Sequence, residues 1–162
     1  AVCKALGATQ VVATEVSPYR IGLAEKLGVD VCLNPRTDDV DAALGRLQPD
    51  GFDATLEMSG HPTALPLAIS HTRPGGRISM LGVYPDRLHD LDVNMAIFMG
   101  LDLQGIVGRR LWDTWDQMSW LLTEKHLNVL DVITHQVPYT EFDSAFEAMR
   151  AGTAGKIVLD FD

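Results

Sequence analysis

The sequence lacks any apolar run approaching the roughly 20 residues needed to cross a bilayer. We also expect no signal peptide, because residues 1–8 resemble the end of a helix rather than a basic segment followed by an apolar one. Basic residues are few: 13 Lys and Arg stand against 22 Asp and Glu, giving a formal net charge of −9. Nucleic acids and anionic membranes select clustered positive charge, and only Arg109 and Arg110 are adjacent here. We therefore expect neither kind of partner.

Cysteine is almost absent, and Cys3 and Cys32 lie far apart in apolar segments. Their spacing matches neither a metal-ligand motif nor a disulfide framework, so we expect reduced, buried thiols and a cytoplasmic setting. None of the five histidines has a His or Cys partner at zinc-site spacing. They are His61, His71, His89, His126 and His135. His135 lies in a predicted strand, so we expect it to be structural.

Short runs rich in β-branched residues alternate with helical segments along most of the chain. Strands are predicted at Val11–Val16, Val31–Leu33, Phe52–Met58, Arg77–Gly82 and Leu101–Val107. Helices are predicted up to Leu6-Gly7, from Ser17-Pro18 to Leu27, over Val40–Leu47 and over Pro62–His71. This alternation predicts an α/β fold with a parallel sheet and helical crossovers. The strands are mostly apolar, which indicates that both faces of the sheet are covered.

The pattern changes near Arg110, which divides the sequence into residues 1–110 and 111–162. A helix predicted over Leu111–Thr123 carries three tryptophans, which we expect to pack against chain outside this sequence or against a neighbouring subunit. It is followed by a strand near Val132–Val137, a helix over Glu141–Ala151 capped by Thr140 and closed by Gly152, and a strand at Lys156–Asp160. Whether the late strands join the parallel sheet stays open.

Glu15 lies near the carboxyl end of a predicted strand, just before a capped helix. Ligands bind at that end of open parallel sheets, where an acidic residue accepts hydrogen bonds from an adenosine ribose and repels a 2′-phosphate. The alternative is a solvated carboxylate favoured by the helix dipole. Arg20 could stack on the adenine or be an ordinary surface arginine. A dinucleotide fold also needs a Gly-rich turn about twenty residues before the acid, so that turn and the first strand would precede Ala1.

Small and apolar residues also stand where the later strands end. They are Ser59-Gly60, Leu81-Gly82-Val83 and Ile106-Val107-Gly108. Each alone is typical of a turn, but glycine there also allows close approach of the backbone to a ligand. Because the carboxyl ends of parallel strands meet at one edge of a sheet, these residues together predict one crevice.

Longer segments carry a resemblance to a known family. The segments are GFDATLEMSG, GGRISMLGV, LDLQGIVGRRLWDTW and VITHQVPYTEFDSAFEAMRAGTAGKIVLDFD. In this order they resemble the L-threonine 3-dehydrogenase family of the zinc-containing medium-chain dehydrogenases, over the C-terminal half of such an enzyme. GRRLWDTW followed by ITH is the more particular part, since GGRI and GKIVL are shared across the superfamily. The resemblance implies a Rossmann-like, doubly wound parallel sheet lacking its first strand. In that family the segment after Arg110 belongs with the catalytic domain.

The resemblance also implies an activity and a site. The activity is oxidation of L-threonine to 2-amino-3-oxobutanoate with hydride transfer to NAD, in a homotetramer joined along the strand at Leu101–Val107. The cofactor-binding residues implied are Glu15, Arg20, Leu81, Gly82, Val83, Ile106 and Val107. Glu15 replaces the more usual Asp, and Val107 stands where the family often has Tyr. The zinc ligands belong to an N-terminal domain, so we expect no catalytic or metal residue here and no turnover by this chain alone.

Two alternatives stay open. One is a non-catalytic nucleotide-binding module, because fold does not dictate function and no catalytic residue is present. The other is a polyol dehydrogenase of the sorbitol type, the nearest competitor in the same superfamily. Comparing threonine with sorbitol as substrates separates this second alternative from threonine oxidation.

Overall fold

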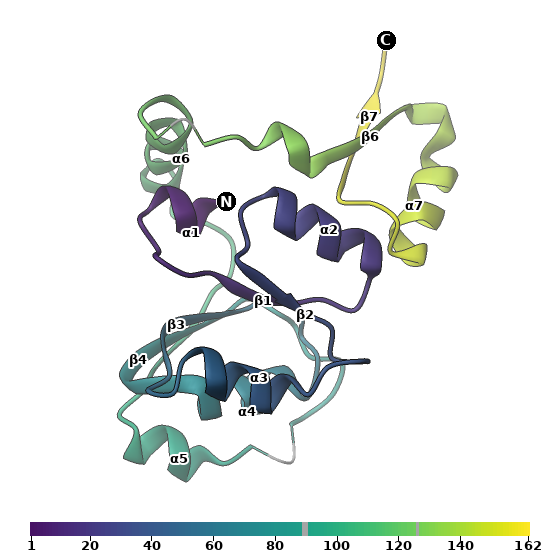
Figure 1. The fold of residues 1–162 in the computed structure, drawn as a ribbon. Coiled ribbons are helices and arrows are strands. Elements are labelled where there is room, and N and C mark those ends of the chain that lie inside the picture. Colours follow the sequence, from purple (N-terminus) through teal and green to yellow (C-terminus); the bar gives the residue numbers. More distant parts are fainter. Residues whose placement is uncertain (89–90, 126) are drawn as a thin grey trace. The chain divides into compact units, whose positions relative to one another are not determined.

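The computed structural model describes residues 1–88, 91–125 and 127–162, and the chain divides into two compact units. Unit 1 comprises Ala1–Asp38 and Arg110–Asp162, and unit 2 comprises Asp39–Arg109. Both units contain parallel strands connected through helices (Figure 1). The predicted α/β class with parallel pairing is therefore confirmed. No helix in the described ranges is long and apolar enough to span a membrane.

The first part of unit 1 is a strand–helix–strand crossover. It contains α1 (Val2–Ala5), β1 (Val12–Thr14), α2 (Pro18–Lys26) and β2 (Val31–Leu33). The two strands pair in parallel, with Ala13 opposite Cys32. As predicted, α2 begins after Ser17, whose side chain accepts a hydrogen bond from the Arg20 amide, with Pro18 at the first helical position.

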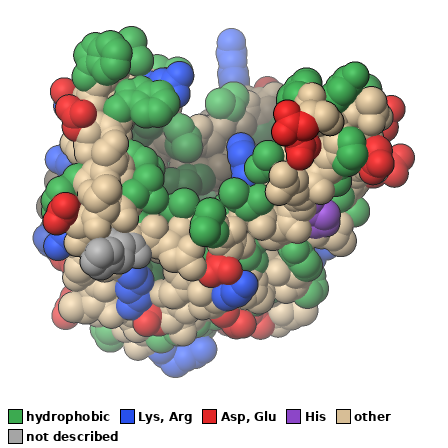
Figure 2. Space-filling model, turned by 90° about the horizontal axis from the view of Figure 1, so that it is seen from above, with side chains coloured by type: hydrophobic (Ala, Val, Ile, Leu, Met, Phe, Trp, Pro, Cys, Tyr) green, Lys and Arg blue, Asp and Glu red, His purple; other side chains and the backbone are tan. Residues whose placement is uncertain are grey.

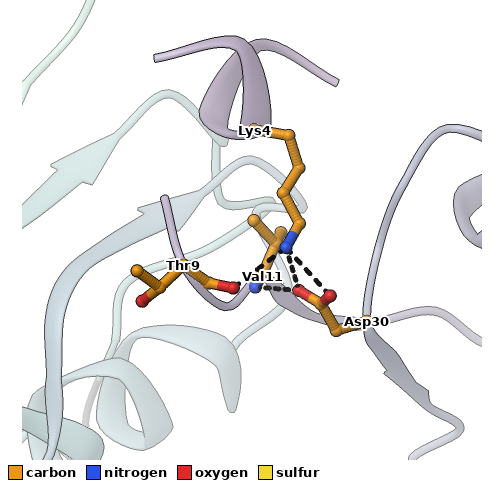
Figure 3. A network of polar contacts seen from close by, with 4 residues as sticks. All are labelled: Lys4, Thr9, Val11 and Asp30. Carbon is orange, nitrogen blue, oxygen red and sulfur yellow. Dashed lines mark hydrogen bonds and ion pairs between the residues drawn. The ribbon is translucent and has the colours of Figure 1, made fainter. Parts of the chain in front are cut away.

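A network of polar contacts lies next to the start of β1 in unit 1 (Figure 3). The Lys4 ammonium on α1 donates to a carboxylate oxygen of Asp30 at 2.9 Å and to the Thr9 carbonyl at 3.1 Å. The other Asp30 oxygen accepts from the Val11 amide at 2.6 Å. Asp30 therefore joins α1, the start of β1 and the turn before β2.

The second part of unit 1 contains the C-terminal elements. These are α6 (Asp113–Thr123), η1 (Leu130–Val132), β6 (Ile133–Pro138), η2 (Tyr139–Glu141), α7 (Phe142–Ala151) and β7 (Lys156–Asp160). Strands β6 and β7 pair with each other in parallel and form a sheet separate from β1–β2. Gly152 closes α7 with a left-handed φ of 70°, as predicted. The predicted Thr140 cap is wrong: Thr140 lies within η2, and the N-cap of α7 is Glu141, without a side-chain cap.

Helix α6 exposes a large apolar surface. The exposed fractions of Trp112, Trp115 and Trp120 are 76%, 53% and 44%. Green side chains gather at the upper left of Figure 2, and Figure 1 draws α6 on the left. The described residues of this chain thus leave much of the tryptophan surface uncovered.

Unit 2 is a three-stranded parallel sheet with helices. It contains α3 (Val40–Leu47), β3 (Phe52–Glu57), α4 (Ala64–His71), β4 (Thr72–Met80), α5 (Val93–Phe98) and β5 (Asp102–Gly105). Strand β4 is central and pairs in parallel with β3 and β5. The buried core joins α4 to the sheet through Ile69 (2% exposed) and Ile78 (0%), with Ala96 of α5. Burying such branched side chains stabilises the unit by about 2 kcal/mol each.

Unit 2 differs most from the sequence prediction in two places, whereas the other bounds shift by at most two residues. Strand β4 begins at Thr72 instead of Arg77, because Thr72 pairs with Phe52 before the Pro74-Gly75-Gly76 segment bulges and the register resumes at Ala54–Arg77. Helix α5 was not predicted at all. It begins after Asp92, whose carboxylate caps it by accepting from the Met95 amide at 3.1 Å.

Candidate functional site

Glu15 lies directly after β1 and is partly buried. Its amide donates to the Leu33 carbonyl of β2 at 3.0 Å. One carboxylate oxygen accepts from the backbone amides of Val16 and Ser17 at 2.8 and 2.9 Å. The charge is thus fixed at the carboxyl end of the strand, next to the positive end of the α2 dipole. This placement suits both the predicted ribose acceptor and a helix-stabilising carboxylate.

Arg20 lies on the first turn of α2, and its guanidinium reaches the chain around the end of α7. Its Nε donates to the Ala154 carbonyl at 3.1 Å, and one terminal nitrogen donates to the Met149 carbonyl at 3.4 Å. Guanidinium hydrogen bonds lie in the plane of the group, so they leave its face available for stacking on a ring. Adenine stacking stays a prediction, and the structure adds an anchoring role within unit 1.

Cys32 is the β2 residue opposite Ala13, and it is a partly buried free thiol. Burial raises the pKa of the Cys32 thiol, and the negative charges of Glu15 and Glu25 raise it further. The thiol is therefore protonated and a poor nucleophile at neutral pH. Cys3 is also free and partly buried, so both cysteines are less buried than predicted.

The carboxyl edge of unit 2 brings the other predicted residues together. The amides of Leu81 and Gly82 donate to the Glu57 carbonyl at 2.8 and 3.2 Å, and the Ile106 amide donates to the Met80 carbonyl at 2.8 Å. Three successive strand ends are therefore joined side by side. Val83 and Val107 project from this edge with exposed fractions of 90% and 96%. Such exposed apolar groups at strand ends suit contact with a ligand.

Packing within the protein requires glycine at two positions of this edge. A Cβ on Gly82 would overlap the Gly60 amide nitrogen and a Glu57 carboxylate oxygen. A Cβ on Gly60, whose φ is +65°, would overlap the Val83 carbonyl oxygen. The turns after β3 and β4 thus touch backbone to backbone. The sequence predicted that each glycine alone is typical of a turn and that together they border a crevice; the close backbone contacts agree with the turn interpretation, and ligand approach stays a prediction.

Glu57, at the end of β3, is a residue that the sequence prediction missed. Its side chain is buried, with 4% of the residue exposed, and accepts from Ser59, Gly60 and Tyr84. Burial raises the pKa of Glu57, but these hydrogen bonds outweigh it and leave the pKa below its ordinary value. A carboxylate closing an otherwise mostly apolar strand, just before Ser-Gly, was the available signal.

No group of three or more potential ligands that could hold a metal is found among the described residues. His61 contacts Thr63 at 2.9 Å, and His71 contacts Asp41 at 2.8 Å. His135, predicted to be structural, lies on β6 and contacts Thr134 at 2.9 Å. His89 and His126 lie outside the described residues.

A surface hollow of about 420 Å³ lies elsewhere in unit 1, between α2 and the η1–β6 segment. The ion pair of Lys26 and Asp131, at 2.7 Å, forms part of its wall. Neither Glu15 nor Arg20 lines it. This hollow therefore has no part in the contacts predicted for Glu15 and Arg20.

Comparison with known proteins matches residues 1–124 to the family described as zinc-binding dehydrogenase. Across its whole length the chain is 42% identical to L-threonine 3-dehydrogenase of Yersinia pseudotuberculosis serotype O:1b (strain IP 31758). It is 40% identical to the enzyme of the same name from Yersinia enterocolitica serotype O:8 / biotype 1B (strain NCTC 13174 / 8081). The chain spans 47% of the length of each of these relatives.

Solved structures of dehydrogenases also match nearly the whole chain. The chain is similar to L-idonate 5-dehydrogenase of Escherichia coli, with 29% identity and a TM-score of 0.79 over 98% of this chain and 44% of that one. It is also similar to 2R,3R-butanediol dehydrogenase of Bacillus subtilis, with 25% identity and a TM-score of 0.87 over 99% of this chain and 46% of that one. The resemblance stated from the sequence is confirmed.

Proposed function

Because the chain belongs to the zinc-binding dehydrogenase family, we propose that it is the cofactor-binding half of an NAD-dependent oxidoreductase acting on L-threonine. The reaction would oxidise the secondary alcohol of threonine to the ketone of 2-amino-3-oxobutanoate, with NAD taking up the hydride when bound. The observation that carries the cofactor assignment is the Glu15 carboxylate, fixed at the carboxyl end of β1 by two backbone amides. The threonine assignment rests on the 42% identity.

Unit 1 provides the adenosine-binding residues of this proposal. Glu15 would accept hydrogen bonds from the ribose hydroxyls, and its charge would repel the 2′-phosphate of NADP. The backbone amides of Val16 and Ser17 hold the carboxylate in place, so little rotamer freedom is lost on binding. Arg20 would cover the adenine with the face of its anchored guanidinium.

Unit 2 provides the remaining contacts of the proposal. Leu81, Gly82 and Val83 follow β4, and Ile106 and Val107 follow β5. The exposed apolar side chains of Leu81, Val83, Ile106 and Val107 would cover the flat faces of the cofactor and exclude water from the carbon that receives the hydride. Their position is set by the strands that they extend.

Zinc is the other group that the family implies, and the described residues do not fit it. They contain no cluster of three or more His, Cys, Asp or Glu that could hold a metal. A zinc-dependent step would therefore need metal ligands from outside the described residues.

We also infer a small-molecule substrate and a homo-oligomer, a tetramer by family resemblance, in a cytoplasmic setting. All four residues of β5 are exposed, and the strand is hydrogen-bonded only to β4 among the described strands. An edge of this kind needs a cover, which a second copy would provide. Sedimentation velocity of the full protein tests this inference, and a monomer at micromolar concentration would contradict it.

The test of the proposed function measures cofactor binding and turnover in the full protein. We expect NAD to bind more tightly than NADP, and NADH to form with L-threonine but not with sorbitol. Turnover of sorbitol in preference to threonine would favour the polyol alternative. NAD binding without turnover of either substrate would favour the non-catalytic module, and absence of NAD binding would refute the proposal.

A further inference from the structure

Glu57 is a buried charge at the edge where we place the cofactor contacts. It is 4% exposed and is one of two buried polar or charged residues among those described, the other being Thr72. A buried carboxylate costs free energy unless it is well hydrogen-bonded. Its contacts therefore show which part of the structure depends on it.

Three oxygen atoms of Glu57 bind two different turns. Oε1 accepts from the Ser59 amide and hydroxyl at 2.8 and 2.7 Å and from the Gly60 amide at 2.9 Å. Oε2 accepts from the Tyr84 hydroxyl at 2.8 Å. The backbone carbonyl accepts from Leu81 and Gly82, in the turn that leads to Tyr84.

These bonds connect residues that follow the paired parts of β3 and β4. The β3–β4 register stops at Glu57 opposite Met80, so the turns after it are outside the regular ladder. The Leu81–Val83 turn is bonded to Glu57 at both of its ends. The amides of Leu81 and Gly82 donate to the Glu57 carbonyl, and the hydroxyl of Tyr84, which follows the turn, donates to the Glu57 carboxylate. The two turns also lie so close together that neither Gly60 nor Gly82 has space for a Cβ.

We propose that Glu57 is a positioning residue that holds the Leu81–Val83 turn against Ser59–Gly60 in the conformation that binds the nicotinamide cofactor, an inference that rests on the proposed function. Glu57 does not touch the cofactor in this role. It acts by keeping the binding-competent turn populated, since the apparent dissociation constant rises in inverse proportion to that population.

The test compares Glu57→Ala and Glu57→Gln in the full protein, with Thr55→Val as a control. Thr55 shares a 2.8 Å hydrogen bond with Thr72 in the same sheet, so its loss lowers stability without touching either turn. We expect Glu57→Ala to raise the Kd and KM for NAD about tenfold or more, with the KM for threonine changed less than about twofold. Glu57→Gln should recover much of the affinity, because its amide oxygen can still accept from Ser59 and Gly60.

The outcomes separate the inference from the proposed function. If the parent protein does not bind NAD, the proposed function fails. If the parent binds NAD, and Glu57→Ala is folded with a Kd within about twofold of the parent or of Thr55→Val, the positioning role fails. If Glu57→Ala does not fold, Tyr84→Phe and Ser59→Ala each remove one of the bonds. Weakened NAD binding at unchanged threonine KM would then support the role, and unchanged NAD binding in both would overturn it.

Discussion

The hydroxyl of Ser17 lies 2.6 Å from the carbonyl oxygen of Gly152 and donates a hydrogen bond to it. The Ser17 hydroxyl oxygen also accepts a hydrogen bond from the Arg20 amide at 3.3 Å and so caps α2. One side chain therefore joins the start of α2 to the end of α7, although 135 residues separate them in the sequence. Stability of the Glu15 turn and of the C-terminal helix should consequently depend on each other.

Ser17→Ala should destabilise unit 1 by roughly 1–2 kcal/mol, because it removes a helix cap and a second hydrogen bond. Urea unfolding followed by circular dichroism measures the change. Ser70→Ala is the matched control, since Ser70 is exposed and its hydroxyl donates to the Leu67 carbonyl three residues before it. Equal, small effects of the two substitutions would show that the Ser17 contacts contribute little.

Gly152→Ala should lower stability by about 1 kcal/mol, because a φ of 70° is unfavourable for alanine. Space is not the cause, since the new Cβ would lie 3.5 Å from Ser17 Cβ, an ordinary contact. Gly22→Ala is the control within α2, where nothing lies within 4 Å of the added Cβ. That substitution should stabilise by roughly 0.5–1 kcal/mol. Melting temperatures that shift in the same direction for both would contradict this account.

Glu15→Ala should weaken NAD binding roughly 10- to 100-fold, because the charged acceptor for two ribose hydroxyls is lost. NADP binding should change less, which narrows the preference for NAD. Isothermal titration of both cofactors in the full protein measures this. Glu25→Ala, an exposed glutamate on α2, serves as the control and should leave both affinities unchanged. An unchanged NAD affinity in Glu15→Ala would remove Glu15 from the site.

Stability should fall on the acid side through Asp30. The hydrogen bond from Lys4, with that from the Val11 amide, holds the pKa of Asp30 below its ordinary value of 3.8. A folded-state pKa below the unfolded one gives stability that is present above pH 3.8 and is lost as pH falls from there toward the folded pKa.

Asp30→Asn should therefore reduce the acid dependence of unfolding, which urea titrations above and below pH 3.8 can measure. The contribution is small, because the pair is on the surface. Asp50→Asn, at an exposed turn carboxylate, is the matched control. If the free energy of unfolding falls with decreasing pH as steeply in Asp30→Asn as in the parent, other carboxylates cause the acid sensitivity.

Local sequence signals predicted the elements whose ends are set by nearby residues. Helix α3 and strand β2 lie where they were predicted, and Ser17-Pro18 and Gly152 mark the start of α2 and the end of α7. These signals failed where the bounds of a strand depend on its pairing with a strand that is distant in the sequence. Pro74-Gly75-Gly76 reads as a break, yet β4 pairs with β3 on both sides of that bulge.

The candidate site shows the same division. The strand-end position of Glu15 followed from a strand signal and a helix cap close together in the sequence. Glu57 was missed because its partner Tyr84 lies 27 residues away, and nothing local shows that a carboxylate in that strand is buried. The bonds of Arg20 to Met149 and Ala154 were equally invisible, since they require α7 to end beside α2.

The division of the strands into three small sheets has a practical consequence for handling the polypeptide. In the described part of the chain, only β4 has a strand partner on both sides, so every other described strand has a row of amides and carbonyls without a strand partner. Such rows template intermolecular pairing, and the net charge of −9 opposes it only while salt is low. Concentrated, high-salt solutions of this polypeptide should therefore turn cloudy, and dilute, low-salt buffers should keep it clear for spectroscopy.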